Sequence, residues 1–243
     1  MKPRIGLILL LACLTVAGYV PVNAAPQPPH HVYFPFFAKG YSAASNGWVT
    51  LLTDDFDSEN ANWTFEDRNG GIGGDFRPGR RTCNPYSGSH SVWLVGGGAD
   101  GSQLPCGANY PNRSDSWMIY GPFDLSDATS AQVNWRVWIN NDFDSADKFC
   151  YRVSGDGIQR ETCIAYPTGT WSPLSYSLTD FLGDSQVSLA LRFVSDAVDI
   201  TAGGAFVDDV VISKCVASTC PPLANPVQNS ADSATSVRLR STP

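Results

Sequence analysis

Short runs in which apolar and polar residues alternate dominate the chain between residues 48 and 216. Side chains along a β-strand point to opposite faces in turn, so each run predicts a strand with one buried face. The segments AQVNWRVWI, 131–139, and QVSLALRFV, 186–194, show this pattern most clearly. Gly, Pro, Asn and Asp separate the runs, and no long segment has helical periodicity. Many short strands with intervening turns predict a single all-β domain, a sandwich of two antiparallel sheets.

Residues 1–24 have the order of a secretory signal peptide. A basic start, MKPR, precedes the apolar run IGLILLLACLTVAGYV, and VNA supplies small residues for cleavage after Ala24. A membrane anchor is the weaker interpretation, because the run is shorter than a spanning helix requires. LLAC, residues 10–13, resembles a lipoprotein processing box, so a cell-surface lipoprotein attached through Cys13 is a further alternative. We expect a secreted, extracellular protein with no transmembrane segment.

Two aperiodic segments flank the predicted domain. Residues 25–47 are rich in Pro, Ser and Gly, which is typical of a linker. Residues 217–243 are polar and lack periodicity, so we expect a disordered tail there. The folded domain is therefore predicted at 48–216, with flexible tails on both sides.

Six of the seven cysteines lie outside the predicted signal peptide, and an even number in an exported chain indicates disulfides. Many connectivities are possible, and the sequence does not choose between them. Local pairing is the simplest hypothesis, because a bridge across the predicted hairpin around SGDG, 154–157, is feasible. A zinc site is the alternative, but the chain has no CxxC pair. The expected disulfides are Cys83–Cys106, Cys150–Cys163 and Cys215–Cys220.

The formal net charge of −7 and the lack of a basic patch disfavour nucleic acids and anionic membranes as partners. Catalytic patterns are also scarce. Of three histidines only His90 lies in the predicted domain, and neither H-E-x-x-H nor G-x-S-x-G occurs. Paired carboxylates of a glycosidase need only proximity in space, so they stay an alternative. We expect that the protein is not an enzyme.

Carboxylates gather near both ends of the predicted domain, which TDDFDSENANW opens and GGAFVDDVVISKC closes. Because strand side chains alternate, either Asp208 or Asp209 must point inward, where an unpaired carboxylate is costly. The ends of a domain tend to lie close together, so acidic residues of the first and last strands would supply oxygen ligands for calcium. The alternative is that the inward aspartate accepts backbone N–H groups at a strand bend.

The two acidic segments resemble the opening and the closing strand of MAM domains. The segment 110–139 is similar to jelly-roll accessory modules of secreted bacterial proteins, including those that accompany immune-inhibitor-A-type peptidases. The resemblance covers about residue 50 to Cys215 and implies a jelly roll with structural calcium and a role in adhesion or ligand binding. By position it implies, as metal ligands, Asp55, Asp57, Asp208 and Asp209. MAM domains usually carry cysteines in the opening segment, but this chain has none between Asp54 and Thr82, so their disulfide pattern does not transfer.

These features favour a secreted, non-catalytic binding or adhesion module, stabilised by calcium and disulfides, whose partner is an extracellular protein or a polysaccharide. A carbohydrate-binding module is the first alternative, because the polar face of segment 131–139 carries Trp138 beside Arg136 and Asn134. Burial of Trp138 against a loop or a neighbouring strand is the competing interpretation. An accessory domain of a secreted peptidase, or a fragment related to one, is the second alternative.

Overall fold

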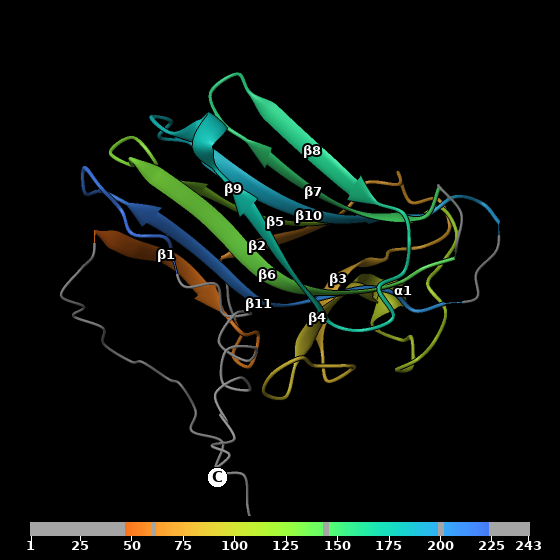
Figure 1. Ribbon diagram of the computed structural model, residues 1–243. Coiled ribbons are helices and arrows are strands. Elements are labelled where there is room, and N and C mark those ends of the chain that lie inside the picture. The colour runs from red at the N-terminus through yellow and green to blue at the C-terminus, as the bar shows by residue number, and fades with distance from the viewer. Residues whose placement is uncertain (1–46, 60–61, 143–145, 199–201, 224–243) are drawn as a thin grey trace, which may run out of the picture. The chain divides into compact units, whose positions relative to one another are not determined.

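Two antiparallel sheets packed face to face make up the folded part of the chain in a computed structural model (Figure 1). The structure describes residues 47–59, 62–142, 146–198 and 202–223, all within one compact unit, Ser42–Pro243. This confirms the predicted all-β sandwich. The predicted signal peptide, nearly all of the predicted linker and residues 224–243 of the predicted tail lie outside the described residues. Among the described residues, no helix is long and apolar enough to cross a membrane.

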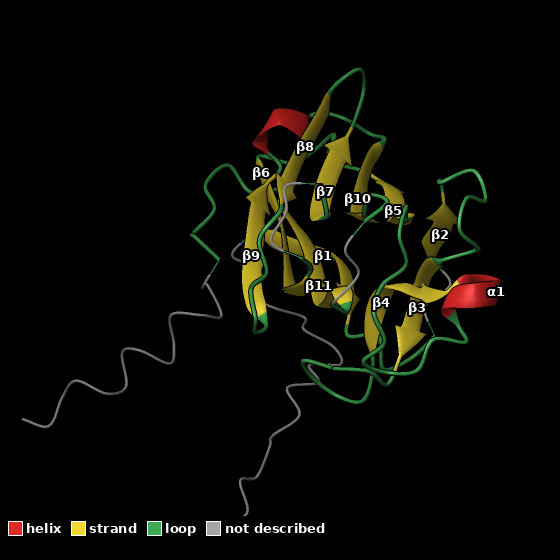
Figure 2. Cartoon of the chain, turned by 90° about the vertical axis from the view of Figure 1, so that its right-hand side faces the viewer, coloured by secondary structure: helices red, strands yellow, loops and turns green. Residues whose placement is uncertain are grey.

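The first sheet has six strands, in the order β3-β4-β11-β6-β9 with β1 also paired to β11. These strands are β1 (Trp48–Asp54), β3 (Arg77–Arg81), β4 (Ser91–Gly97), β6 (Ser130–Asn140), β9 (Ser172–Ser177) and β11 (Gly204–Cys215). The second sheet has five strands, in the order β2-β5-β10-β7-β8, and Figure 2 shows them as a separate layer. These are β2 (Trp63–Asp67), β5 (Asp115–Phe123), β7 (Lys148–Ser154), β8 (Gln159–Ile164) and β10 (Val187–Val194). Short helices α1 (Gly98–Gly101) and η1 (Thr179–Phe181) lie in the connections.

Strand β11 organises the first sheet, because it pairs along both of its edges. Strand β6 follows one edge, whereas β4 and β1 share the other edge in succession. Phe206 and Val207 pair with β4, and the part of β11 from Val210 to Cys215 pairs with β1 (Figure 1). The predicted proximity of the first and last strands is therefore confirmed, with Asp54 opposite Val210.

Alternating burial along the strands builds the core between the sheets. In β6 every second side chain is buried, as the pattern predicted, and the remaining side chains lie on the outward face, half-buried except for the exposed Asn140. The core is rich in aromatic residues, including the fully buried Trp93, Trp135, Phe149, Phe181 and Phe193. Burying a large apolar side chain contributes roughly 1.5–3 kcal/mol, so these residues dominate the hydrophobic stabilisation.

The structure contains the three disulfides that local pairing suggested, Cys83–Cys106, Cys150–Cys163 and Cys215–Cys220. Cys150 and Cys163 occupy directly opposite positions of the β7–β8 hairpin, with 4.0 Å between their Cα atoms. Cys215–Cys220 attaches the residues after β11 to its end, where the indole N–H of Trp48 donates to the carbonyl of Pro221. Each bridge therefore fixes a strand or loop at the periphery of the sandwich.

Candidate functional site

A β-bulge in β11 determines how the two central aspartates point. The register between β11 and β6 shifts between Asp208 and Val211, and Asp209 has a φ of 48°, in the left-handed region. The bulge lies where β4 ends and β1 begins along the same edge of β11. A bulge re-aims side chains and interrupts pairing. As a result, Asp208 is buried and Asp209 is half-buried, and the 82–90 loop between β3 and β4 covers both of them.

Asp208 does not point into the core between the sheets: it lies opposite Arg136 on the outward face, where the 82–90 loop buries it and its carboxylate accepts backbone N–H groups. Oδ2 accepts the N–H of Tyr86 at 2.8 Å and that of Ser87 at 3.3 Å, and Oδ1 accepts the N–H of Asp209 at 2.8 Å. Burial raises the pKa of Asp208 to about 7, in spite of these donors. The interpretation of an aspartate that accepts amides at a strand bend thus describes its observed contacts.

The other three candidate carboxylates surround the same loop. Asp209 Oδ1 accepts the hydroxyl of Ser87 at 2.7 Å, and its pKa is raised by burial, with Asp55 and Asp57 adding to the effect. Asp57 Oδ1 accepts the N–H of Ser89 at 2.6 Å, which lowers the pKa of Asp57. The fold therefore brings Asp55 and Asp57 close enough to Asp209 to raise its pKa.

These carboxylates have the right chemistry for calcium, since hard oxygen ligands from acidic side chains are what calcium prefers. In the described part of the chain, however, the only three metal-ligating side chains whose ligand atoms lie within 4.8 Å of one another are Cys150, Glu161 and Cys163. Two of these form a disulfide and are not available to a metal. The oxygens of Asp55, Asp57, Asp208 and Asp209 thus lie near one another without forming a closed cage.

His90 has neighbours that superficially suggest catalysis. Its Nδ1 lies 2.7 Å from Ser89 Oγ, 3.0 Å from a guanidinium nitrogen of Arg80 and 3.9 Å from Asp57 Oδ1. In a catalytic triad the imidazole bridges hydroxyl and carboxylate through its two different nitrogens. Here all three contacts are made to one nitrogen, so the arrangement does not have the geometry of a triad.

The outward face of the first sheet carries a cluster of aromatic rings and one arginine. We call Tyr86, Arg136, Trp138 and Trp171 the Tyr86 platform. The ring of Trp171 contacts those of Tyr86 and Trp138 edge-on, with centroids 5.8 and 6.2 Å apart. The guanidinium of Arg136 lies 4.5 Å from the ring centroid of Tyr86, within the range of a cation–π contact. Tyr86 is 42% exposed, and the other three side chains are half-buried.

The structure places Asn134, Arg136 and Trp138 on one face of β6, as the alternation predicted, but they do not form one cluster in the described contacts. Trp138 packs against Trp171, which precedes the first residue of β9, and Arg136 stacks on Tyr86. Asn134 lies further along the strand, opposite Val211 and Ser175. Trp138 is therefore partly covered by a loop residue and also belongs to an accessible cluster.

Sequence reasoning did not assign Tyr86 or Trp171 to a site, and in the structure both precede strands instead of lying within them. Tyr86 is in the 82–90 loop, and Trp171 directly precedes β9. Alternation reports which face of a strand is buried, and it carries no information about loop residues. The presence of an aromatic residue beside Gly and Ser in YSGS, 86–89, and TGTWS, 168–172, was the available signal, and it is a weak one.

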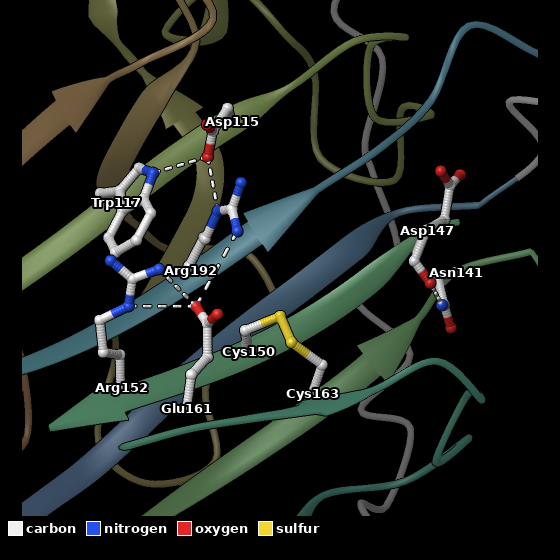
Figure 3. Close-up of a disulfide and its surroundings, with 9 residues drawn as sticks. All are labelled: Asp115, Trp117, Asn141, Asp147, Cys150, Arg152, Glu161, Cys163 and Arg192. Atoms are coloured by element: carbon white, nitrogen blue, oxygen red, sulfur yellow. Dashed lines mark hydrogen bonds and ion pairs between the residues drawn. A yellow bond between two sulfur atoms is a disulfide. The ribbon is translucent and has the colours of Figure 1, made fainter. Parts of the chain in front are cut away.

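The outward face of the second sheet is occupied by its own ion pairs (Figure 3). The guanidinium groups of Arg68, Arg152 and Arg192 lie 4.4–4.8 Å from the ring centroid of Trp117. Each is also paired with a carboxylate, as in the 2.6 Å contact between Arg192 Nε and Asp115. Trp117 itself is only 4% exposed. This face offers few unoccupied donors, in contrast to the Tyr86 platform.

No protein-family model matches the chain, and no curated protein matches it. Similar solved structures include the K1 adhesin domain of Lys-gingipain from Porphyromonas gingivalis, 19% identical, with a TM-score of 0.44 over 68% of this chain and 97% of that one. A xylan-binding domain of carbohydrate-binding module family 22 is 13% identical, with a TM-score of 0.43 over 70% and 97% of the two chains. A family 11 carbohydrate-binding module from Clostridium thermocellum, in complex with a mixed-linked tetrasaccharide, is 11% identical, with a TM-score of 0.40 over 68% and 95%. These similarities are too distant to indicate a ligand for this chain.

Proposed function

We propose that this chain is a secreted, non-catalytic module that binds a polysaccharide on the Tyr86 platform. The observation that carries the proposal is the contact of an exposed Tyr86 with Trp171 and Arg136. Sugar rings have apolar faces that stack on aromatic side chains and hydroxyl groups that accept N–H donors. Binding sites combine aromatic surface with a few well-placed polar groups in this way.

Rigid strands support the platform, which suits recognition of a regular polymer. Arg136 and Trp138 belong to β6, a central strand of the first sheet, and Asp208 in β11 holds the backbone of Tyr86. Sites built on such elements are positioned more accurately than sites on unsupported loops. Export agrees with the three disulfides, because disulfides persist in oxidising compartments.

Calcium forms part of this proposal as a structural ion at the junction of β1 and β11. The residues that would hold it are Asp55, Asp57, Asp208 and Asp209. Support comes from the effect of Asp55 and Asp57 in raising the pKa of Asp209, since neighbouring carboxylates repel and a divalent cation relieves that repulsion. When bound, calcium would supply charge neutralisation at the bulge. The relation to a secreted peptidase stays a prediction of the sequence.

Affinity gel electrophoresis against a panel of soluble polysaccharides tests the proposal. We expect at least one polysaccharide to retard the protein, and both Tyr86→Ala and Trp138→Ala to weaken that binding roughly tenfold or more. Tyr86→Phe keeps the ring and should retain most of the binding, and Ile72→Ala removes an exposed apolar side chain in another loop as a control. If no polysaccharide binds, or if the two alanine variants bind as the wild type does, the proposal is wrong.

A further inference from the structure

Arg136 has no acceptor for its guanidinium N–H groups among the described residues, although it is half-buried. Most other described arginines donate to carboxylates or backbone carbonyls: Arg68, Arg77, Arg80, Arg81, Arg152, Arg160 and Arg192. A guanidinium is always charged and carries five donors in a planar fork. A half-buried arginine whose donors are unoccupied is therefore unusual within this fold.

Hydrogen bonds from the 82–90 loop occupy the two aspartates nearest to Arg136. Asp208 is its direct cross-strand neighbour, but the Asp208 carboxylate turns to the amides of Tyr86 and Ser87. Arg136 is near enough to Asp209 to lower the pKa of the Asp209 carboxyl. In the described part of the chain, however, no carboxylate oxygen lies within 4.0 Å of an Arg136 nitrogen, the limit for a salt bridge. Arg136 thus has two acidic neighbours, and both of them accept hydrogen bonds from the 82–90 loop.

The guanidinium of Arg136 is held over the ring of Tyr86 by a contact that uses none of its hydrogen-bond donors. Arg136 stacks at 4.5 Å on the centroid of Tyr86, the most exposed residue of the platform. A cation–π contact does not occupy the N–H donors, which point outward from the edge of the planar guanidinium. Such an edge matches an anionic group, and a carboxylate can accept two of these hydrogen bonds in parallel.

We propose that the Tyr86 platform binds an acidic polysaccharide, one whose sugars carry carboxylate or sulfate groups, and that Arg136 pairs with the anionic group. This inference rests on the proposed function and adds the ligand's charge. Tyr86 and Trp171 would contact the apolar faces of the sugars. The net charge of −7 repels a polyanion at long range, so recognition depends on this local contact.

The test compares acidic and neutral polysaccharides in affinity gels at near-physiological ionic strength, where exposed charges are screened beyond ~8 Å. The acidic arms are polygalacturonate and alginate for carboxylates and chondroitin sulfate for sulfates, and the neutral arms are xylan and galactan. We expect an acidic polysaccharide to bind and Arg136→Gln to weaken its binding roughly tenfold or more. Arg160→Gln, which removes an exposed arginine of β8 paired with Asp180, is the matched control and should bind normally.

Arg136→Lys provides a second variant should Arg136→Gln fail to fold, because it keeps the charge and loses the planar fork. Weaker binding of the acidic polysaccharide by Arg136→Lys than by the wild type supports pairing with the anionic group, and unchanged binding contradicts it. Binding of neutral polysaccharides alone, lost in Tyr86→Ala but not in Arg136→Gln, would overturn the acidic ligand and leave the proposed function standing. Binding of an acidic polysaccharide that Arg136→Gln leaves unchanged would also overturn the proposed role of Arg136. Failure of every polysaccharide to bind rejects both proposals.

Discussion

Asp208 Oδ2 accepts the backbone N–H of Tyr86 at 2.8 Å, although 122 residues separate the two in the chain. The last strand of the sandwich thereby holds the exposed aromatic residue of the platform. Gly88 allows the same loop to approach Asp57 closely, because a Cβ there would lie 1.9 Å from Asp57 Oδ2. The acidic cluster and the Tyr86 platform are thus joined by a single loop.

Removing the Asp208 carboxylate should destabilise the fold and weaken ligand binding together. We expect Asp208→Ala to lower the free energy of unfolding by roughly 1–3 kcal/mol, because three N–H groups lose their acceptor. Asp209→Ala should cost less, since Asp209 is half-buried and accepts the Ser87 hydroxyl. Urea unfolding measures both. Asp180→Ala, at an exposed ion pair, is the control and should change little.

Stability should depend on pH through Asp208. The folded-state pKa of about 7 lies above the ordinary value of 3.8, so the folded protein binds this proton more tightly than the unfolded chain does. The contribution of this group is therefore complete below about pH 4 and is lost as the pH rises through about 7. With chelator present, urea unfolding of wild type and Asp208→Asn across this interval should show a shallower decline in the variant. Parallel curves would contradict a raised pKa at Asp208.

Calcium should raise the melting temperature if the carboxylates at the β1–β11 junction bind it. Ligand that binds only the folded state stabilises it by about 2.7 kcal/mol at a concentration 100 times the Kd. We expect a lower melting temperature in excess chelator and recovery on adding calcium, with neither response in Asp57→Ala or Asp209→Ala. A melting temperature that chelation leaves unchanged would reject the calcium proposal.

The three disulfides should differ in their contribution to stability according to the loops they close. The sequence separations are 23 residues for Cys83–Cys106, 13 for Cys150–Cys163 and 5 for Cys215–Cys220. A disulfide that closes a loop of about 15 residues contributes roughly 3 kcal/mol through the entropy of the unfolded chain, and shorter loops contribute less. Pairwise replacement by alanine and urea unfolding should therefore give losses in that order. The largest loss at Cys215–Cys220 would contradict the entropic explanation.

Replacing the arginines of the second sheet should affect stability alone. Arg152→Met removes a cation–π contact with Trp117 and an ion pair with Glu161, and we expect a loss of up to about 1 kcal/mol. Polysaccharide binding, measured in the same affinity gels, should not change. Loss of binding in this variant would indicate that the ligand binds the second sheet, and would contradict the proposed site on the first sheet.

Alternation in β6 and β10 was enough to predict a sandwich, because burial of one strand face is a local periodic property. The same local information suggested the Cys150–Cys163 bridge, whose two residues lie in adjacent strands of one hairpin. The paired ends of the domain followed from the tendency of chain termini to lie together, and β1 indeed pairs with β11.

Tertiary structure alone decided where the buried aspartate lies and what it meets. Alternation predicted that Asp208 or Asp209 points into the core, but Asp208 lies beside Arg136 on the outward face, and the 82–90 loop buries it and gives it amide donors. Likewise, β6 placed Arg136 and Trp138 on one face, but only the folded loops brought Tyr86 and Trp171 to them. The periodicity of a strand is a property of residues adjacent in the sequence. The contacts of a loop depend on segments distant in the sequence, which meet only when the sheets assemble.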